Sequence, residues 1–245
     1  MAFEPELVSA VGLSLKVAGG AMVFVMPIGG GLGYILARYR FPGWRWLEAI
    51  VMLPLVLPPV AVGFFVLVLL GRNGAIGRVV YALTGQMLVF SWQGAAIAAA
   101  IVALPLMVKT TKAALENVDR VYLQAATTLG SPPIAVFWRV WLPLAWRGIL
   151  AGIVLSFSRA LGEFGATLMV AGNIAGITQT VPMAIYDAVQ VGDDERAFVL
   201  VGLLSGLSIG AVLLGSYQEG TPQSCRGCGQ NKCDKTNAKK NVSTG

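Results

Sequence analysis

Five long apolar stretches, separated by short polar segments, dominate the first 215 residues of the chain. They cover roughly residues 8–36, 46–70, 87–108, 148–171 and 197–215. An α-helix needs about 20 predominantly apolar residues to cross the hydrocarbon core of a bilayer. The pattern therefore predicts an all-α fold, a polytopic membrane helix bundle with about five transmembrane spans.

The composition favours the same class of protein. The chain is 56% hydrophobic and only 12% charged, whereas an average soluble domain carries about 25% charged residues. Its formal net charge of +6 is not accompanied by interleaved basic and aromatic residues, so we expect no binding to nucleic acid. These properties exclude an ordinary soluble domain and favour a protein embedded in the lipid bilayer.

The positions of Lys and Arg predict how the bundle is oriented. Thirteen of them lie after the first span, between the third and fourth spans, and after the fifth span. The opposite side has only three, which are Arg72, Arg78 and Arg196. Because cytoplasmic loops retain more Lys and Arg, we expect the N-terminus outside and the C-terminus in the cytoplasm. Residues 1–216 are thus predicted to form the membrane domain, with a cytoplasmic loop at 109–147.

The tail over residues 217–245 differs sharply from the rest of the chain. It is polar and rich in Gly, Asn and Lys, a composition typical of disorder. It also holds all three cysteines, Cys225, Cys228 and Cys233, and the chain has no histidine. A closed structural zinc site uses four ligands, and disulfides are rare in the cytoplasm. We therefore expect no metal, no disulfide and no cofactor.

The cytoplasmic loop contains an unusual stretch, "QAATTLGSPPIAVFWRVWLP", at residues 124–143. The segment 118–129 lacks Gly and Pro and is predicted to be a short helix, with Asp119 suited to its N-cap. Gly130 permits a left-handed termination, and Pro132-Pro133 prevents continuation. A short helix at the membrane face suits either of two roles: docking of a soluble protein, or anchoring of the loop at the interface.

The spacing within this stretch resembles the cytoplasmic loop signature of ABC importer permeases. The matching positions begin with an Ala-Ala pair, continue with a glycine after three residues, and end with Leu-Pro; Gln124 replaces the family's glutamate. The residues that the resemblance assigns to coupling with an ATPase are Gln124, Ala125, Ala126, Gly130, Leu142 and Pro143. Two other stretches, "LPLVLPPVAVG" and "SRALGEFGATLMVAGNIAGITQTVPMAIY", are similar to the molybdate branch, to which sulfate and thiosulfate permeases are closely related.

The resemblance implies a set of partners and a location. It implies a multi-pass subunit of the cell inner membrane, a homodimer of two copies, a cytoplasmic ATP-binding subunit dimer and an external solute-binding protein. The transported substrate would be an oxyanion. The chain lacks a GxxxxGK[ST] phosphate loop, so it is not expected to be an enzyme, and ATP hydrolysis falls to the partner. A sulfate or thiosulfate permease, and an ion-gradient-driven anion carrier, stay open as alternatives.

Several residues are candidates for the translocation path or its gate. Prolines interrupt the second span, and interrupted helices often border transport sites, although a simple packing kink is the alternative. Charges within a span should face the bundle interior and pair with each other; such a pair could brace the bundle, gate the path or attract an oxyanion. The candidates are Pro54, Pro58, Pro59, Arg159, Glu163, Thr167 and Asn173.

Glycines recur at four-residue spacing in three of the predicted spans. Small residues at this interval let helix backbones approach closely. We expect these glycines to lie at helix contacts, and expect those of the fifth span to pack within the bundle. The positions are Gly29 and Gly33, Gly148 and Gly152, and Gly202, Gly206 and Gly210.

Overall fold

The computed structural model describes residues 3–39 and 41–217, and all regular secondary structure within these ranges is helical. The predictions for residues 218–245, including the three cysteines, lie outside the described residues. The elements in chain order are α1 (Phe3–Arg38), α2 (Trp44–Val56), α3 (Pro59–Leu70), α4 (Ala75–Thr84), α5 (Trp92–Glu116), α6 (Arg120–Thr128), α7 (Pro133–Val136), the π-helical turn η1 (Phe137–Trp141), α8 (Leu142–Leu161), α9 (Gly165–Ala171), α10 (Val181–Val191) and α11 (Asp194–Tyr217).

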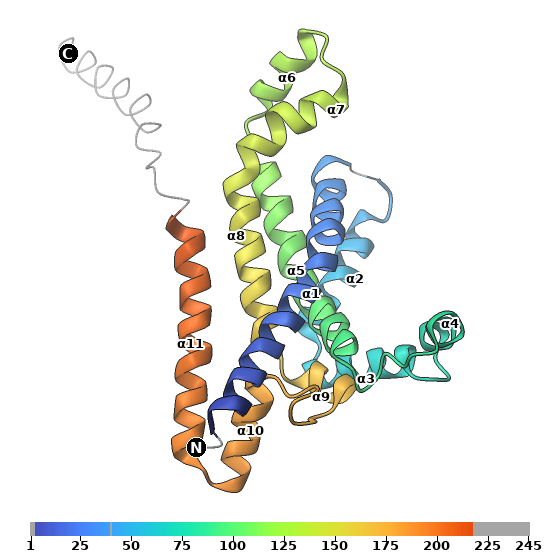
Figure 1. The fold of residues 1–245 in the computed structure, drawn as a ribbon. Helices are drawn as coiled ribbons and strands as arrows, with labels where there is room; N and C mark the ends of the chain where they lie inside the picture. Colours follow the sequence, from blue (N-terminus) through green and yellow to red (C-terminus); the bar gives the residue numbers. More distant parts are fainter. Residues whose placement is uncertain (1–2, 40, 218–245) are drawn as a thin grey trace, which may run out of the picture.

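Helix α5 lies at the centre of the bundle, between α1 and α8 (Figure 1). It begins where the Ser91 hydroxyl accepts a hydrogen bond from the Gly94 backbone N–H at 3.2 Å, an N-cap. Its small side chains let both neighbours approach closely. The buried alanines along it are Ala95, Ala96, Ala98, Ala99, Ala100 and Ala103.

Glycines on α1 and α8 complete these close contacts, as predicted. A Cβ atom added to Gly33 would lie 2.7 Å from the Cβ of Thr111, and one on Gly29 would lie 2.8 Å from the Cγ of Met107. On the other side of α5, a Cβ on Gly148 would lie 2.6 Å from the Cβ of Ala114. Both helix pairs therefore depend on the absence of a side chain at these positions.

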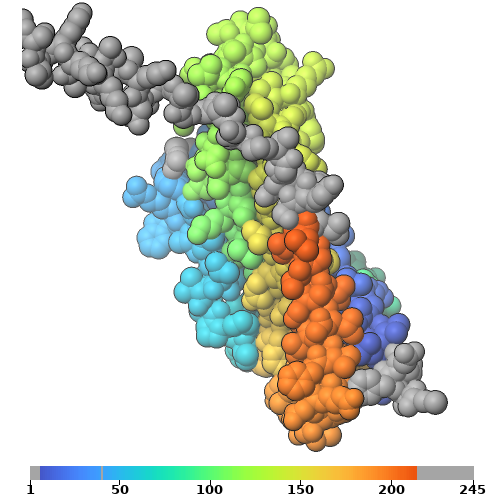
Figure 2. All heavy atoms as spheres, turned by 90° about the vertical axis from the view of Figure 1, so that its left-hand side faces the viewer, coloured from blue at the N-terminus to red at the C-terminus, as the bar shows by residue number. Residues whose placement is uncertain are grey.

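The prediction for the glycines of the fifth span is wrong within this protomer. No atom lies within 4 Å of a Cβ built on Gly202, Gly206 or Gly210. Helix α11 packs against the bundle through other residues, among them Leu200 and Leu204. Helix α11 lies on the surface of the bundle, in front of α8 (Figure 2). Its glycines lie on the face opposite the residues that pack against the bundle.

The second predicted span is broken rather than merely kinked. The helix axis bends by 110° between α2 and α3, with the break at Leu57 and Pro58. Leu57 has extended backbone angles, φ −71° and ψ 147°, as expected for a residue before proline. Pro59 then occupies the first position of α3, where its missing N–H costs no hydrogen bond.

The fourth predicted span, residues 148–171, is also not one continuous helix. Helix α8 ends at Leu161, and α9 begins at Gly165 after a short irregular segment. Apolarity continues across the break, so hydropathy alone does not reveal it. The break places Glu163 beyond the end of α8 and not on its surface, although the side chain still reaches Arg159.

The two ends of the bundle are built differently. The start of α1, α10 and the start of α11 lie at one end, while α6 and α7 lie at the other (Figure 1). Within residues 3–39 and 41–217, four helices are long and apolar enough to cross a membrane, and the bent pair α2 and α3 makes a fifth span if it is counted as one. Many large apolar side chains point outward, as lipid contact requires. Examples are Phe64, Phe65, Val68, Phe198 and Leu213.

Candidate coupling and translocation sites

Helix α6 forms with the boundaries that its local sequence favours. The Asp119 carboxylate accepts a hydrogen bond from the Val121 backbone N–H at 3.0 Å and caps the helix. Gly130 has a φ of +78°, the left-handed conformation that ends many helices. No side chain of α6 is buried. The predicted short helix is confirmed, and most of its side chains are exposed, with Leu123 and Ala126 half-buried.

The segment after α6 leads into α8 through a π-helical turn. Pro143 lies in the first turn of α8. Proline has no backbone N–H, so this residue cannot donate the usual hydrogen bond to the preceding turn. The wider turn η1, Phe137–Trp141, directly precedes it. Leu142 is half-buried and packs against the main core. The Leu-Pro pair thus fixes where the loop ends and the long helix begins.

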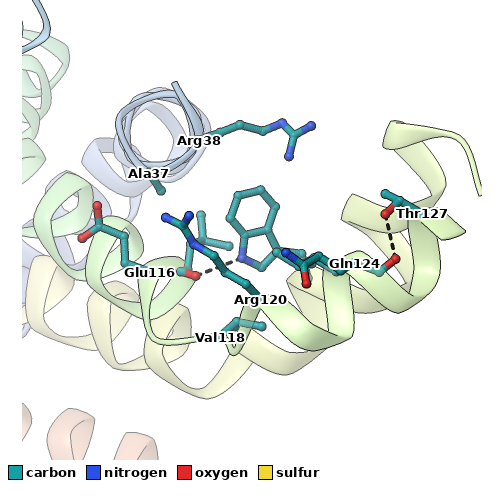
Figure 3. Close-up of a pocket in the computed structure, with 10 residues that line it drawn as sticks. Ala37, Arg38, Glu116, Val118, Arg120, Gln124 and Thr127 are labelled. Atoms are coloured by element: carbon teal, nitrogen blue, oxygen red, sulfur yellow. Dashed lines mark hydrogen bonds between the residues drawn. The ribbon is translucent and has the colours of Figure 1, made fainter. Parts of the chain in front are cut away.

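A cavity of about 300 Å³ lies beside α6, at the ends of α1 and α5. Arg38 from α1 and Arg120 and Gln124 from α6 surround it, with Glu116 at the end of α5 (Figure 3). Trp141 from η1 forms its floor, and the Arg38 guanidinium lies 5.7 Å from this ring. The structure thus places Gln124 at a polar cavity rather than in the core.

The predicted coupling residues divide into two groups. Gln124, Ala125 and Gly130 are exposed on or just after α6, and Ala126 is half-buried there. Leu142 and Pro143 lie at the start of α8, on the other side of α7 and η1. Both groups belong to the same end of the bundle (Figure 1).

Arg159 and Glu163 form the ion pair that their spacing predicted. The Arg159 Nη1 lies 2.6 Å from the Glu163 Oε2, with side-chain exposures of 30% and 1% respectively. The other carboxylate oxygen of Glu163 accepts a hydrogen bond from the Ala166 backbone N–H at 2.9 Å, at the start of α9. A buried carboxylate with both oxygens satisfied holds the end of α8 to the start of α9.

The two helix breaks lie against each other. Helices α3 and α9 pack closely, and a Cβ on Gly63 would lie 2.8 Å from the Ala166 Cα. A Cβ on Gly165 would lie 3.1 Å from the Pro59 Cβ. Thr167 is buried nearby, where its hydroxyl donates to the Phe164 carbonyl at 2.9 Å. Pro59 and the Glu163 turn therefore meet at one place, which the separate motifs did not indicate.

Of the remaining path candidates, Pro58 adjoins Pro59 at this crossing, while Pro54 and Asn173 lie outside it. Pro54 is inside α2, half-buried, and Pro58 precedes α3 with its ring exposed. Asn173 lies in the loop before α10, where its Nδ2 donates to Asp187 Oδ1 at 2.7 Å. Gln179 donates to the other oxygen of Asp187 at 2.6 Å. Asp187 thus ties the loop to α10, a role that no motif predicted.

Sequence reasoning missed further contacts. Glu48 on α2 accepts a hydrogen bond from Lys112 on α5 at 2.7 Å, across 64 positions in the chain. The Ser14 hydroxyl on α1 accepts from the Val181 backbone N–H at 2.8 Å. Neither pair has a local sequence signal, since each depends on how distant helices pack. Among the described residues, no group of three or more metal-binding side chains is found.

The arrangement of helices as a whole is similar to the fold of a membrane chain from a solved ABC transporter. The fold matches a chain of the MetNI methionine ABC transporter, solved in inward-facing conformations, with a TM-score of 0.69. The alignment covers 87% of this chain and 96% of that chain at 19% identity. At this identity the likeness concerns the fold alone.

The sequence then defines the family. Residues 29–218 match the family described as binding-protein-dependent transport system inner membrane component, and the chain belongs to this family. It is therefore a multi-pass, non-catalytic subunit of the inner membrane.

Two relatives bear on its specificity. The chain is 44% identical over 211 residues to the molybdenum transport system permease protein ModB of Haemophilus influenzae, covering 86% of this chain and 92% of that protein. It is 35% identical to the sulfate transport system permease protein CysT of Salmonella typhimurium, covering 84% of this chain and 74% of that protein. The molybdenum permease is the more similar of the two.

Proposed function

We propose that the chain is the permease subunit of an ATP-driven importer for molybdate or a similar tetrahedral oxyanion. The observation that carries this proposal is α6, a capped helix without a single buried side chain, held at one end of the bundle. Such a helix contributes little apolar burial to its own protomer. An ATP-binding subunit would cover it, and the greater similarity to a molybdenum permease supports the substrate.

The proposed complex follows the distribution of positive charge. Helix α6 and the C-terminus face the cytoplasm, and the N-terminus lies outside, so that the segment 117–141 meets the ATPase. This segment is shorter than the predicted loop 109–147, because α5 continues to Glu116 and α8 begins at Leu142. Residues 1–216 form the membrane domain. Two copies of the chain bind an ATP-binding subunit dimer, and an external solute-binding protein delivers the oxyanion. When ATP closes the dimer, displacement of α6 tilts the spans and opens the path outward.

The crossing of α3 and α9 is proposed as part of the path or its gate. It brings together two broken helices, as transport sites often do, and it holds the charged pair Arg159 and Glu163. Both oxygens of Glu163 are engaged, which favours a brace or gate over a deep anion well. Pro58 and Thr167 belong to this crossing, at the start of α3 and on α9. Pro54 inside α2 and Asn173 in the loop before α10 lie outside it and are proposed to border other parts of the path.

A sulfate importer is the second candidate, since the sulfate permease of Salmonella typhimurium also matches most of the chain. Molybdate and sulfate are both tetrahedral dianions, so the membrane path alone discriminates them weakly. Competition decides between the two. Tungstate should compete with labelled molybdate for uptake, and sulfate should not; equal competition by sulfate would favour the second candidate.

Substitution of Gly130 tests the role of α6. A Cβ at Gly130 meets no atom of the protomer within 4 Å, so added bulk has no steric obstacle unless a partner covers the helix. The φ of +78° strains most side chains, so the effect of bulk must be separated from this backbone cost. We expect Gly130→Trp to abolish uptake while membrane insertion stays intact. The matched control is Gly130→Asn, because Asn tolerates the left-handed conformation and adds less bulk; it should retain most uptake. Normal uptake by the tryptophan variant would contradict docking at α6.

A further inference from the structure

Helix α6 has few direct ways to act on the long helices. Its contacts are chiefly with α7 and η1, and of its side chains only Leu123 packs against the main core. A push on α6 must therefore pass through the segments at its two ends. On the α8 side, these segments are α7 and η1, which continue directly into the long helix.

Trp141 is the residue where this segment meets the other helices. Its side chain is buried, and its indole Nε1 donates to the Leu115 carbonyl, in the last turn of α5, at 2.9 Å. On the opposite side, the Tyr34 ring of α1 lies 5.5 Å from the Trp141 ring and 4.6 Å from the Phe137 ring, both in edge-on geometry. One side chain thus contacts α1 and α5 directly before α8 begins.

Trp141 combines side-chain contacts to two helices with a position at the end of a π-helical turn. The π-helical turn that carries it is a geometry often found at functional sites. The cavity that Trp141 lines leaves space next to α6. The hydrogen bond and the edge-on rings hold the far side against α1 and α5. The segment α7–η1 can therefore move on the side of the cavity while Trp141 keeps its contacts with α1 and α5.

We propose that Trp141 is the positioning residue that transmits displacement of α6 to α1 and α5 together with α8. This proposal rests on the proposed function, since it requires an ATPase that moves α6. Without the contacts of Trp141 with Leu115 and Tyr34, α6 would move with the α7–η1 segment while the cytoplasmic ends of α1 and α5 stayed in place. ATP hydrolysis would then continue with less transport per cycle. Trp141 contacts neither substrate nor nucleotide in this account; it acts through the helices that it holds.

The test is the number of oxyanions transported per ATP hydrolysed, measured with the reconstituted full complex. Trp141→Phe keeps an aromatic ring but removes the donor to Leu115. We expect this variant to assemble with the ATP-binding subunit and to hydrolyse ATP, but to transport several-fold less molybdate per ATP. Trp46→Phe is the matched control, because this tryptophan on α2 is 76% exposed; its ratio should equal that of the unmodified chain.

Other outcomes decide against the proposal. An unchanged ratio for Trp141→Phe overturns it, as does an equal fall in both variants. If Trp141→Phe fails to assemble, Tyr34→Leu removes the contact of Trp141 with α1 and is judged by the same ratio. Absence of ATP-driven uptake by the unmodified complex would instead contradict the proposed function, so the two failures are distinguishable.

Discussion

At the scale of single residues, Glu163 is tightly held by its surroundings. It is nearly fully buried, pairs with Arg159, and accepts a hydrogen bond from the first turn of α9. A buried charge is tolerated only when it is paired and hydrogen-bonded. Glu163 meets both conditions, so its loss affects two helices at once.

Neutralising Glu163 should be more harmful than neutralising the whole pair. Removing one partner of a buried ion pair costs about 3–5 kcal/mol, since it leaves an uncompensated charge. We expect Glu163→Gln to reduce both thermal stability in detergent and uptake. The double variant Arg159→Gln/Glu163→Gln should recover stability. Recovery of uptake as well would identify a brace, whereas stable protein without uptake would assign Arg159 a direct role in transport.

Asp187 is a second constrained residue, at the opposite end from α6. It accepts hydrogen bonds from the side-chain amides of Asn173 and Gln179, one on each oxygen. Asp187→Asn would leave one of these donors facing another donor. We expect faster hydrogen exchange over residues 173–180 with unchanged exchange in α5. Unaltered exchange in the loop would show that the amide bonds do not order it.

At the scale of elements, the close crossing of α3 and α9 depends on glycine. A Cβ on Gly63 would lie within 2.9 Å of the Ala166 backbone oxygen and the Met169 Cβ. Backbone atoms cannot move aside easily, and overpacking of this kind costs about 1–3 kcal/mol. The crossing is therefore a rigid contact between two broken helices.

Gly63→Ala should lower the melting temperature of the purified protein and reduce uptake. Gly202→Ala is the control, because no atom lies within 4 Å of its added Cβ and both glycines occupy helices. Its effect on stability should be neutral or slightly favourable, since alanine has the higher helix propensity. Equal destabilisation by both substitutions would show that the crossing is not tightly packed.

The elements also show how far the sequence predicts this molecule. Local chemistry was sufficient for α6, where Asp119 and Gly130 mark the two ends. Hydropathy alone missed the break after Leu161, because the residues on both sides stay apolar. The glycine pattern of α11 was misleading for a different reason. The spacing shows that one helix face carries small residues, but it does not show whether another helix packs on that face.

The candidate sites were predicted to a similar degree. The Arg159–Glu163 pair follows from spacing, and the pairing is confirmed. The candidate coupling residues come from the family resemblance, and their role stays a prediction. The contacts of Trp141 and of Asp187 were not predictable, since each joins segments whose proximity arises only from packing. Residues with a local signal were found, and residues defined by distant contacts were not.

At the scale of the whole molecule, α8 links the two sites. Leu142, at its start, and Arg159, near its end, are 17 residues apart in one helix, which is about 25 Å at 1.5 Å per residue. A stiff helix of this length can carry a movement of the coupling segment to the crossing of α3 and α9. In the proposed mechanism, α8 therefore transmits movement from the ATP-binding subunit to the crossing of α3 and α9.

The most direct test of the account is uptake of labelled molybdate into proteoliposomes that contain this chain with its ATP-binding subunit and solute-binding protein. The account predicts uptake that requires ATP, is blocked by vanadate, and persists when ion gradients are collapsed. Uptake that continues without ATP and stops when the gradients are collapsed would contradict it.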